Sequence, residues 1–160
     1  MKPEHIKAIQ WSESNKKSLT KSLNTLKSIK GFDQRVQIAH NQVFDEVDCL
    51  ECGNCCRTTG PLLLNSDIDR IARKLKISPK EFSNRYLKVD EENDFVFKSM
   101  PCTFLGTDNH CSIYEFRPRA CRAFPHTDQK GQAQILHLTR KNSKICPAVS
   151  KILKLLSELG

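Results

Sequence analysis

Apolar side chains recur at intervals of three and four along residues 3–30, which predicts an amphipathic helix. These positions are Ile6, Ile9, Leu19, Leu23, Leu26 and Ile29. The opposite face is basic and is expected to be solvated; it carries Lys7, Lys16, Lys17, Lys21, Lys27 and Lys30. Gly31 is expected to end this helix.

A second helix is predicted over residues 34–47, with Asp33 as its N-cap. Its inward side chains are expected to be Val36, Ala39, Val43 and Val47. This helix leads the chain to Cys49, the first residue of a cysteine-rich run.

Two capping boxes then predict a pair of helices. Ser66 with Asp69 is expected to open the first, and Ser78 with Glu81 the second. Pro79 stands at the first helical position of the second helix, where proline is favoured.

Short extended segments are predicted in the middle of the chain. Residues 61–64 read as an extended stretch, and residues 94–98 alternate as a strand does. The sequence GTDNH, residues 106–110, separates two short apolar stretches and predicts a hairpin. Cys102 and Cys111 would lie near the two ends of that hairpin.

Two further elements follow towards the C-terminus. Residues 133–139, AQILHLT, are predicted to form a strand. Residues 147–159 are predicted to form a closing helix with Pro147 in its first turn.

The sequence also contains eight cysteines, which bear on its function. They are Cys49, Cys52, Cys55, Cys56, Cys102, Cys111, Cys121 and Cys146. No apolar run reaches the ~18 residues of a membrane span, and the N-terminus lacks the apolar region of a secretory signal. We therefore expect a cytoplasmic protein, in which this many thiols indicate metal or redox chemistry rather than disulfides.

The spacing of the thiols suits metal binding. Cys49, Cys52 and Cys55 are each separated by two residues, which lets neighbouring sulfurs reach one centre. Gly53 supplies backbone freedom within the run. All eight cysteines are candidate ligands and divide into two groups of four, although spacing alone does not say which cysteines share a centre.

Two kinds of metal centre remain open. The C-x2-C-x2-C run and the later Cys146-Pro147 resemble ferredoxin ligands, although Cys56 follows without a spacer. This favours an iron–sulfur cluster, 4Fe–4S in particular, over Zn²⁺. If the metal is zinc, four cysteines leave no open position, and the site would be structural.

Arginines around Cys121 are candidates to neutralise thiolates. Arg117, Arg119 and Arg122 lie in the sequence IYEFRPRACRAFP, and Arg122 is the leading candidate to contact the cofactor. Pro118 is expected to begin a short helix there. His110 and His126 are the histidines near the cysteines and are alternative ligands, whereas His5, His40 and His137 stand apart.

The sequences CLECGNCC, PCTFL, CSIYEFRPRACRAFP and the final Cys-Pro together resemble the CxxCxxCC, or YkgJ-type, cysteine-cluster family. The resemblance covers about residues 49–147. It implies a domain that chelates zinc or iron, and it suggests a relation to flagellin lysine N-methylases. No Gly-rich S-adenosylmethionine loop and no radical-SAM motif accompany it, so the methyl transfer does not carry over.

These observations predict an α+β fold. The expected architecture is a small single domain of several helices and short strands or a hairpin, organised around a cysteine-ligated metal centre, plus the N-terminal amphipathic helix. We divide the chain into an N-terminal helical extension, residues 1–45, and a cysteine-cluster metal-binding domain, residues 46–160.

Three functional hypotheses follow. The first is a metal-binding cysteine-cluster protein with a redox or structural role. The second is an iron–sulfur-dependent enzyme that modifies a protein, which the basic N-terminal helix would recruit. The third is a zinc-stabilised interaction module. The net charge of +8 is weak evidence for a nucleic-acid partner, because eight thiolates would cancel it.

Overall fold

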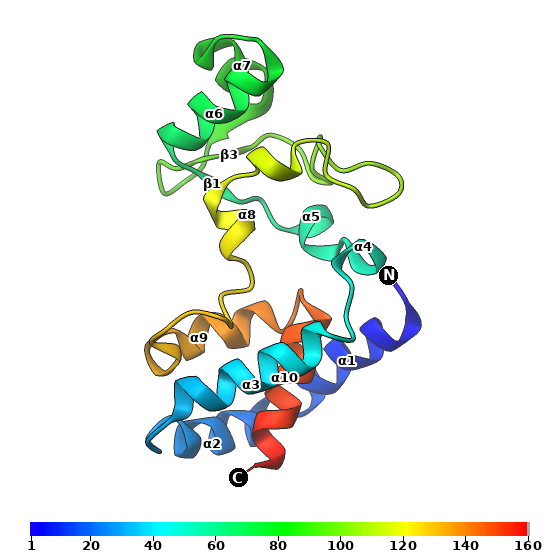
Figure 1. Cartoon of the computed structure of the whole chain (residues 1–160), viewed down its shortest axis with the longest axis vertical. Coiled ribbons are helices and arrows are strands. Elements are labelled where there is room, and N and C mark those ends of the chain that lie inside the picture. Colours follow the sequence, from blue (N-terminus) through cyan, green and yellow to red (C-terminus); the bar gives the residue numbers. More distant parts are fainter. Residues whose placement is uncertain (160) are drawn as a thin grey trace. The chain divides into compact units, whose positions relative to one another are not determined.

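The computed structural model describes residues 1–159, and the chain forms two compact units (Figure 1). The first unit, called here the helical unit, consists of Met1–Cys52 and Pro125–Gly160. Gly53–Phe124 make the other, the sheet unit. Each unit has its own cluster of buried apolar side chains. The division predicted at residue 45 stays a prediction.

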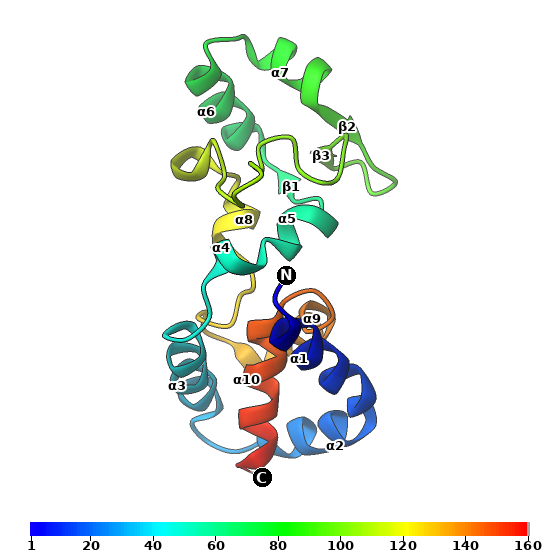
Figure 2. The same cartoon turned by 90° about the vertical axis from the view of Figure 1, so that its right-hand side faces the viewer.

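The helical unit is built around its last helix. Its elements are α1 (Pro3–Ser14), α2 (Lys16–Leu26), α3 (Phe32–Phe44), α4 (Cys49–Cys52), α9 (Gln132–Asn142) and α10 (Pro147–Glu158). Helix α10 packs against α1, α2, α3 and α9, and it runs between α3 and the α1–α2 pair in Figure 2. The helix predicted over 147–159 is confirmed, and the one predicted over 34–47 exists as α3, which begins two residues earlier and ends at Phe44.

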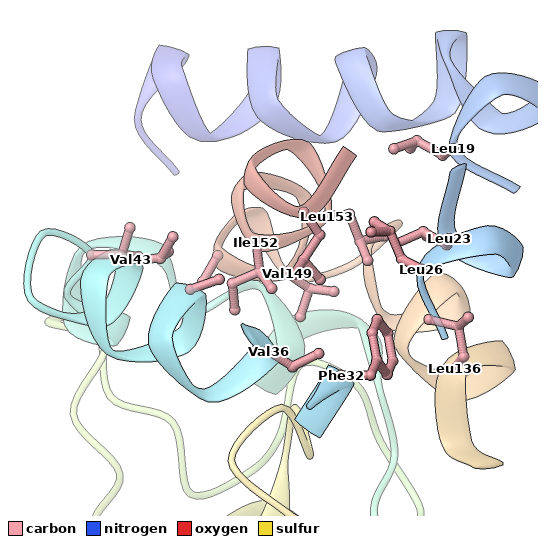
Figure 3. Close-up of a cluster of buried hydrophobic side chains, with 14 residues drawn as sticks. Leu19, Leu23, Leu26, Phe32, Val36, Val43, Leu136, Val149, Ile152 and Leu153 are labelled. Carbon is pink, nitrogen blue, oxygen red and sulfur yellow. The ribbon is translucent and has the colours of Figure 1, made fainter. Parts of the chain in front are cut away.

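Apolar side chains of α10 form the centre of this unit. Val149, Ile152 and Leu153 are almost fully buried and face Phe32 and Val36 of α3 (Figure 3). Because α10 presents its apolar stripe to several helices at once, the hydrophobic effect makes it the common packing partner of the unit.

The single helix predicted over residues 3–30 is wrong, since the chain forms α1 and α2 there. The break lies at Asn15, whose side-chain amide donates to the Trp11 carbonyl at 2.9 Å. The backbone of Asn15 leaves helical geometry, with ψ of 13°. Asparagine favours such breaks because its amide competes for backbone hydrogen bonds.

The buried face of α1 also differs from the prediction. Ile6 is 41% exposed, whereas His5 and Ser12 are 2% and 3% exposed. The Ser12 hydroxyl lies 3.1 Å from that of Ser150 in α10. Farther along, the predicted burial of the α2 leucines and the exposure of the lysine face are confirmed.

Residues 133–139 belong to α9, so the strand prediction is wrong. The alternation there is short, and the residues that α9 buries, Gln132, Leu136 and Thr139, follow helical spacing instead. Asp33 is not the N-cap of α3. Its carboxylate accepts the backbone N–H groups of Gly131 and Gln132, at 2.7 and 2.8 Å, and so caps α9.

The sheet unit combines short helices with a small sheet. Its elements are α5 (Asn54–Thr58), β1 (Leu62–Leu63), α6 (Asn65–Leu75), α7 (Pro79–Tyr86), β2 (Leu87–Val89), β3 (Phe95–Phe97), the 3₁₀ helix η1 (Tyr114–Phe116) and α8 (Arg119–Ala123). The strands are antiparallel in the order β1-β3-β2. The strand predicted over 94–98 is confirmed.

Helix starts in the sheet unit follow local capping rules. The Glu81 N–H donates to the Ser78 hydroxyl at 3.1 Å, which confirms the second predicted capping box. The first is wrong by two residues. Helix α6 begins at Asn65, and the Asp67 carboxylate accepts the Leu64 N–H at 3.0 Å.

The predicted hairpin around GTDNH exists only in part. Leu105 and Cys111 form an isolated antiparallel bridge, and the Gly106 N–H donates to the His110 carbonyl at 2.8 Å. Tyr114–Phe116 turn into η1 instead of extending the second arm. The α+β prediction therefore holds as a mostly helical fold with a small three-stranded antiparallel sheet. Among residues 1–159, no helix has the length and apolar character needed to cross a membrane.

Candidate metal centre

Four cysteines of the sheet unit lie close enough to influence one another. Cys56 belongs to α5 and Cys121 to α8, while Cys102 and Cys111 flank the Gly106 turn. Burial raises the pKa of Cys121, Cys102 and Cys111, and electrostatic repulsion from the neighbouring sulfurs adds to this effect. All four are half-buried. The fold thus gathers thiols from three separate segments of sequence.

Backbone contacts hold these segments together. The Cys102 N–H donates to the Cys56 carbonyl at 2.8 Å, which joins the chain after β3 to α5. The Leu105–Cys111 bridge joins the two arms of the turn. Phe104, between Cys102 and Cys111, is 6% exposed and packs in the core of the sheet unit.

Buried Asp67 secures the helix that carries Cys121. Its carboxylate accepts the Arg119 N–H at 3.1 Å and the Arg70 guanidinium at 2.6 Å. Burial alone would raise the Asp67 pKa, but hydrogen bonds from Arg70, Leu64 and Arg119 hold it below the ordinary value. Arg70 also donates to the Arg117 carbonyl at 2.9 Å. The charged carboxylate therefore ties α6 to the start of α8.

Backbone N–H groups face two of the sulfurs. Burial raises the pKa of Cys102, and hydrogen bonds from the Phe104 and Leu105 backbone oppose this. Burial likewise raises the pKa of Cys111, against a backbone hydrogen bond from Ile113. Donors two and three residues after a cysteine are suited to stabilise a thiolate, the form that binds metal.

The fold shifts the pKa values of Cys121 and Cys56 in opposite directions. Burial, with the nearby sulfurs, raises the pKa of Cys121 to about 12. Interaction with the Cys55 thiol, 3.9 Å away, lowers the pKa of Cys56 to about 7, helped by Arg57 and Arg117 and opposed by burial. Cys56 is therefore the thiol of this group that deprotonates first.

Of the arginines around Cys121, it is Arg117 rather than Arg122 whose charge acts on these thiols. The positive charge of Arg117 lowers the pKa of Cys56, Cys111 and Cys121. The Arg122 guanidinium is exposed and donates to the carbonyls of Glu115 and Arg117, at 2.9 and 3.3 Å. The cofactor contact predicted for Arg122 stays a prediction.

Arg57 is a site residue that sequence reasoning did not single out. It follows Cys56 and lowers its pKa, and its guanidinium hydrogen-bonds to Asn109. That bond passes over Gly53, whose φ of +56° and lack of a Cβ leave room for the guanidinium. Adjacency to a cysteine was the only signal for Arg57 in the sequence.

Three further cysteines lie in the helical unit. Cys49 and Cys52 bound α4, and Cys146 is the N-cap of α10. Burial raises the pKa of Cys146 to about 12; backbone N–H groups of Val149 and Ala148 lower it, and the Cys49 and Cys52 sulfurs raise it. The three thiols therefore form a second group, and the Cys146 sulfur lies at the N-terminal end of a helix.

The two histidines predicted as alternative ligands have other contacts. His110 is exposed and lies 3.3 Å from the Asp108 carboxylate. The His126 ring nitrogen lies 3.2 Å from the Gln129 amide. Within residues 1–159, no three cysteine, histidine or acidic side chains already stand together as a complete metal-binding set.

The chemistry of the four-thiol group fits zinc or iron. Both metals accept thiolate ligands, and four sulfurs complete a structural zinc site or an iron–sulfur cluster. The backbone donors and the two arginines around Cys56, Cys102 and Cys111 suit a centre that carries negative charge. Thiols of high pKa, such as Cys121, must lose a proton to bind.

Comparison with known proteins agrees with this chemistry. Neither the curated proteins nor the solved structures contain a significant match to the chain. A family model, described as "putative zinc- or iron-chelating domain", matches residues 48–147, a span that includes all eight cysteines. The chain therefore belongs to the CxxCxxCC family of cysteine-rich, zinc- or iron-chelating domains.

Proposed function

We propose that the sheet unit holds a 4Fe–4S cluster on Cys56, Cys102, Cys111 and Cys121, and that the protein has a redox role. The observation that carries this proposal is the mutual interaction of four thiols within one compact unit. The backbone donors and the arginines around these thiols suit the negative charge of an iron–sulfur cluster, and this favours iron–sulfur over zinc.

Each neighbouring group has a distinct part in this proposal. Arg117 stabilises the thiolates of Cys56, Cys111 and Cys121. The backbone N–H groups after Cys102 and Cys111 donate to their sulfurs. When bound, the cluster supplies one-electron transfer, whose potential such hydrogen bonds and charges tune. Loading it requires the four sulfurs to turn towards one centre and to release their protons.

Anaerobic purification followed by iron, sulfide and zinc analysis tests the proposal. We expect iron and sulfide in equal amounts and the visible absorbance of a cluster. Cys121→Ser should remove both, while Ser112→Ala, beside Cys111 but without a ligand role, should retain them. A colourless protein with stoichiometric zinc and no sulfide would contradict the redox role and leave a structural zinc site.

A second function, recruitment of an acidic partner, is favoured by a cleft in the helical unit. The charged residues of its lining are mostly cationic: Lys16, Arg140, Lys141 and Lys144, beside His137 and the acid Glu13. Lys144 and Glu13 lie 3.8 Å apart, so the cations outnumber the carboxylate. We propose that this cleft, rather than the whole lysine face of the N-terminal helices, binds acidic segments of a protein.

Charge reversal tests the cleft. The double variant Arg140→Glu/Lys141→Glu should abolish binding to an acidic peptide such as poly-glutamate. Lys27→Glu/Lys30→Glu changes the charge equally but lies outside the cleft, and it should bind as the unaltered chain does. Equal losses in the two variants would show only non-specific attraction.

A further inference from the structure

One ring nitrogen of a buried histidine in α1 has no hydrogen-bond partner among residues 1–159. This is His5, which is 2% exposed and whose Nδ1 atom is buried with no donor or acceptor from the described part of the chain. Nearly all buried polar atoms in folded proteins are paired, so an exception calls for an explanation such as an unseen ion. A neutral imidazole nitrogen can offer its lone pair to such an ion.

The surroundings of His5 include both segments that carry the three-thiol group. Besides Glu4 and Lys2 on its own segment, its electrostatic neighbours are Lys151, in the second turn of α10, and Glu51, within α4. The ion pair between Lys2 and Glu51, at 2.6 Å, joins the start of α1 to α4. In Figures 1 and 2, α1 and α10 both begin at the end of the helical unit where α4 lies.

The three-thiol group needs one more ligand to make a four-coordinate metal site. Cys49, Cys52 and Cys146 are the cysteines of the helical unit, and their sulfurs interact. Cys55 belongs to the sheet unit, where its sulfur lies 3.9 Å from that of Cys56. Glu51 is exposed and paired with Lys2. Structural zinc sites are four-coordinate, and three cysteines with one histidine are a common set.

We infer that Cys49, Cys52, Cys146 and the Nδ1 atom of His5 form a structural Zn²⁺ site, separate from the four-thiol centre. This inference rests on the proposed metal-chelating function, and it adds a ligand that lies outside residues 48–147, the span of the family match. The bound ion would provide a partner for the buried Nδ1 atom of His5. It would also join α1, α4 and the start of α10.

Zinc stoichiometry and Co²⁺ substitution in the full chain test this site. His5→Leu keeps the volume and removes the donor. This variant should lower the zinc content by one ion per chain. It should also weaken zinc binding by more than about 100-fold, which is the upper end for changes to residues that only support a ligand. His5→Cys should retain the ion and strengthen the sulfur-to-Co²⁺ charge-transfer absorbance by one thiolate. His40→Leu, a control at a half-buried histidine outside the proposed site, should change neither.

Each outcome distinguishes the site from the four-thiol centre. Unchanged zinc content and Co²⁺ spectrum in His5→Leu would overturn the inference, as would loss of this zinc in Cys55→Ala. Iron and sulfide should persist in every His5 variant. Absence of all metal from the unaltered chain would instead overturn the proposed function. If His5→Leu fails to fold by circular dichroism, the spectrum of His5→Cys decides.

Discussion

Arg117 and Arg122 lie on either side of Cys121 in the sequence but have different surroundings. Of these two arginines, it is Arg117 whose charge lowers the pKa of Cys56, Cys111 and Cys121. We expect Arg117→Gln to raise the pKa of Cys56, Cys111 and Cys121, and so to weaken metal binding at pH 7 by roughly tenfold. Competition with a chromophoric chelator measures this. Arg122→Gln is the matched control, and a larger effect of that variant would support the cofactor contact predicted for Arg122.

The acidity of Cys56 makes a further prediction at the residue scale. Its pKa of about 7 and the Cys121 pKa of about 12 imply very different thiolate fractions at neutral pH. In metal-free protein, iodoacetamide should label Cys56 at least roughly tenfold faster than Cys121. The Cys56 rate should fall as the pH drops below 7, because the thiolate is then protonated. Peptide mapping by mass spectrometry gives both rates, and faster labelling of Cys121 at pH 7 would contradict the assignment.

At the scale of elements, the N-terminus of α9 depends on a residue of α3. Asp33 accepts two backbone N–H groups there, and loss of such a cap costs about 1 kcal/mol. Asp33→Ala should therefore lower the free energy of unfolding in urea by about that amount. Asp45→Ala removes an exposed aspartate that follows α3 and makes no such contact in the described chain, so it should have little effect. Equal losses would argue against capping.

Elements set by neighbouring residues could be predicted from the sequence, and those set by distant contacts could not. Ser78 and Glu81 interact and are only three residues apart in the sequence, so their capping box could be predicted. Asp33 looked like a cap for the helix beside it because its true partners, Gly131 and Gln132, lie far along the chain. Residues 133–139 alternate like a strand, yet burial against α3 and α10 selects a helix.

The same distinction applies to the candidate site. The run of cysteines and its metal chemistry were predictable, because ligand spacing is local. The grouping of Cys56 with Cys121, and of Cys146 with Cys49, depends on the fold and had no signature in spacing. His5 was even less accessible to sequence reasoning, since its burial replaces that of Ile6 on the same helix.

For the whole molecule, the separate cores of the two units imply separate responses to metal loss. Cys121→Ser should lower amide hydrogen-exchange protection mainly in the core of the sheet unit, at residues such as Ile71 and Phe82. Cys146→Ser should lower it mainly in the helical unit, at Val149 and Ile152. Mass spectrometry of exchanged peptides reports each unit. Uniform loss of protection in both variants would show one cooperative structure instead.

The central place of α10 has a consequence for synthesis on the ribosome. Residues 53–124 emerge before α10, so the sheet unit can fold and take up metal while translation continues. The leucines of α2 and the valines of α3 must wait for α10 to cover them. During that interval the nascent N-terminal helices expose apolar side chains that promote aggregation. These helices are therefore the segments on which we expect a chaperone to act.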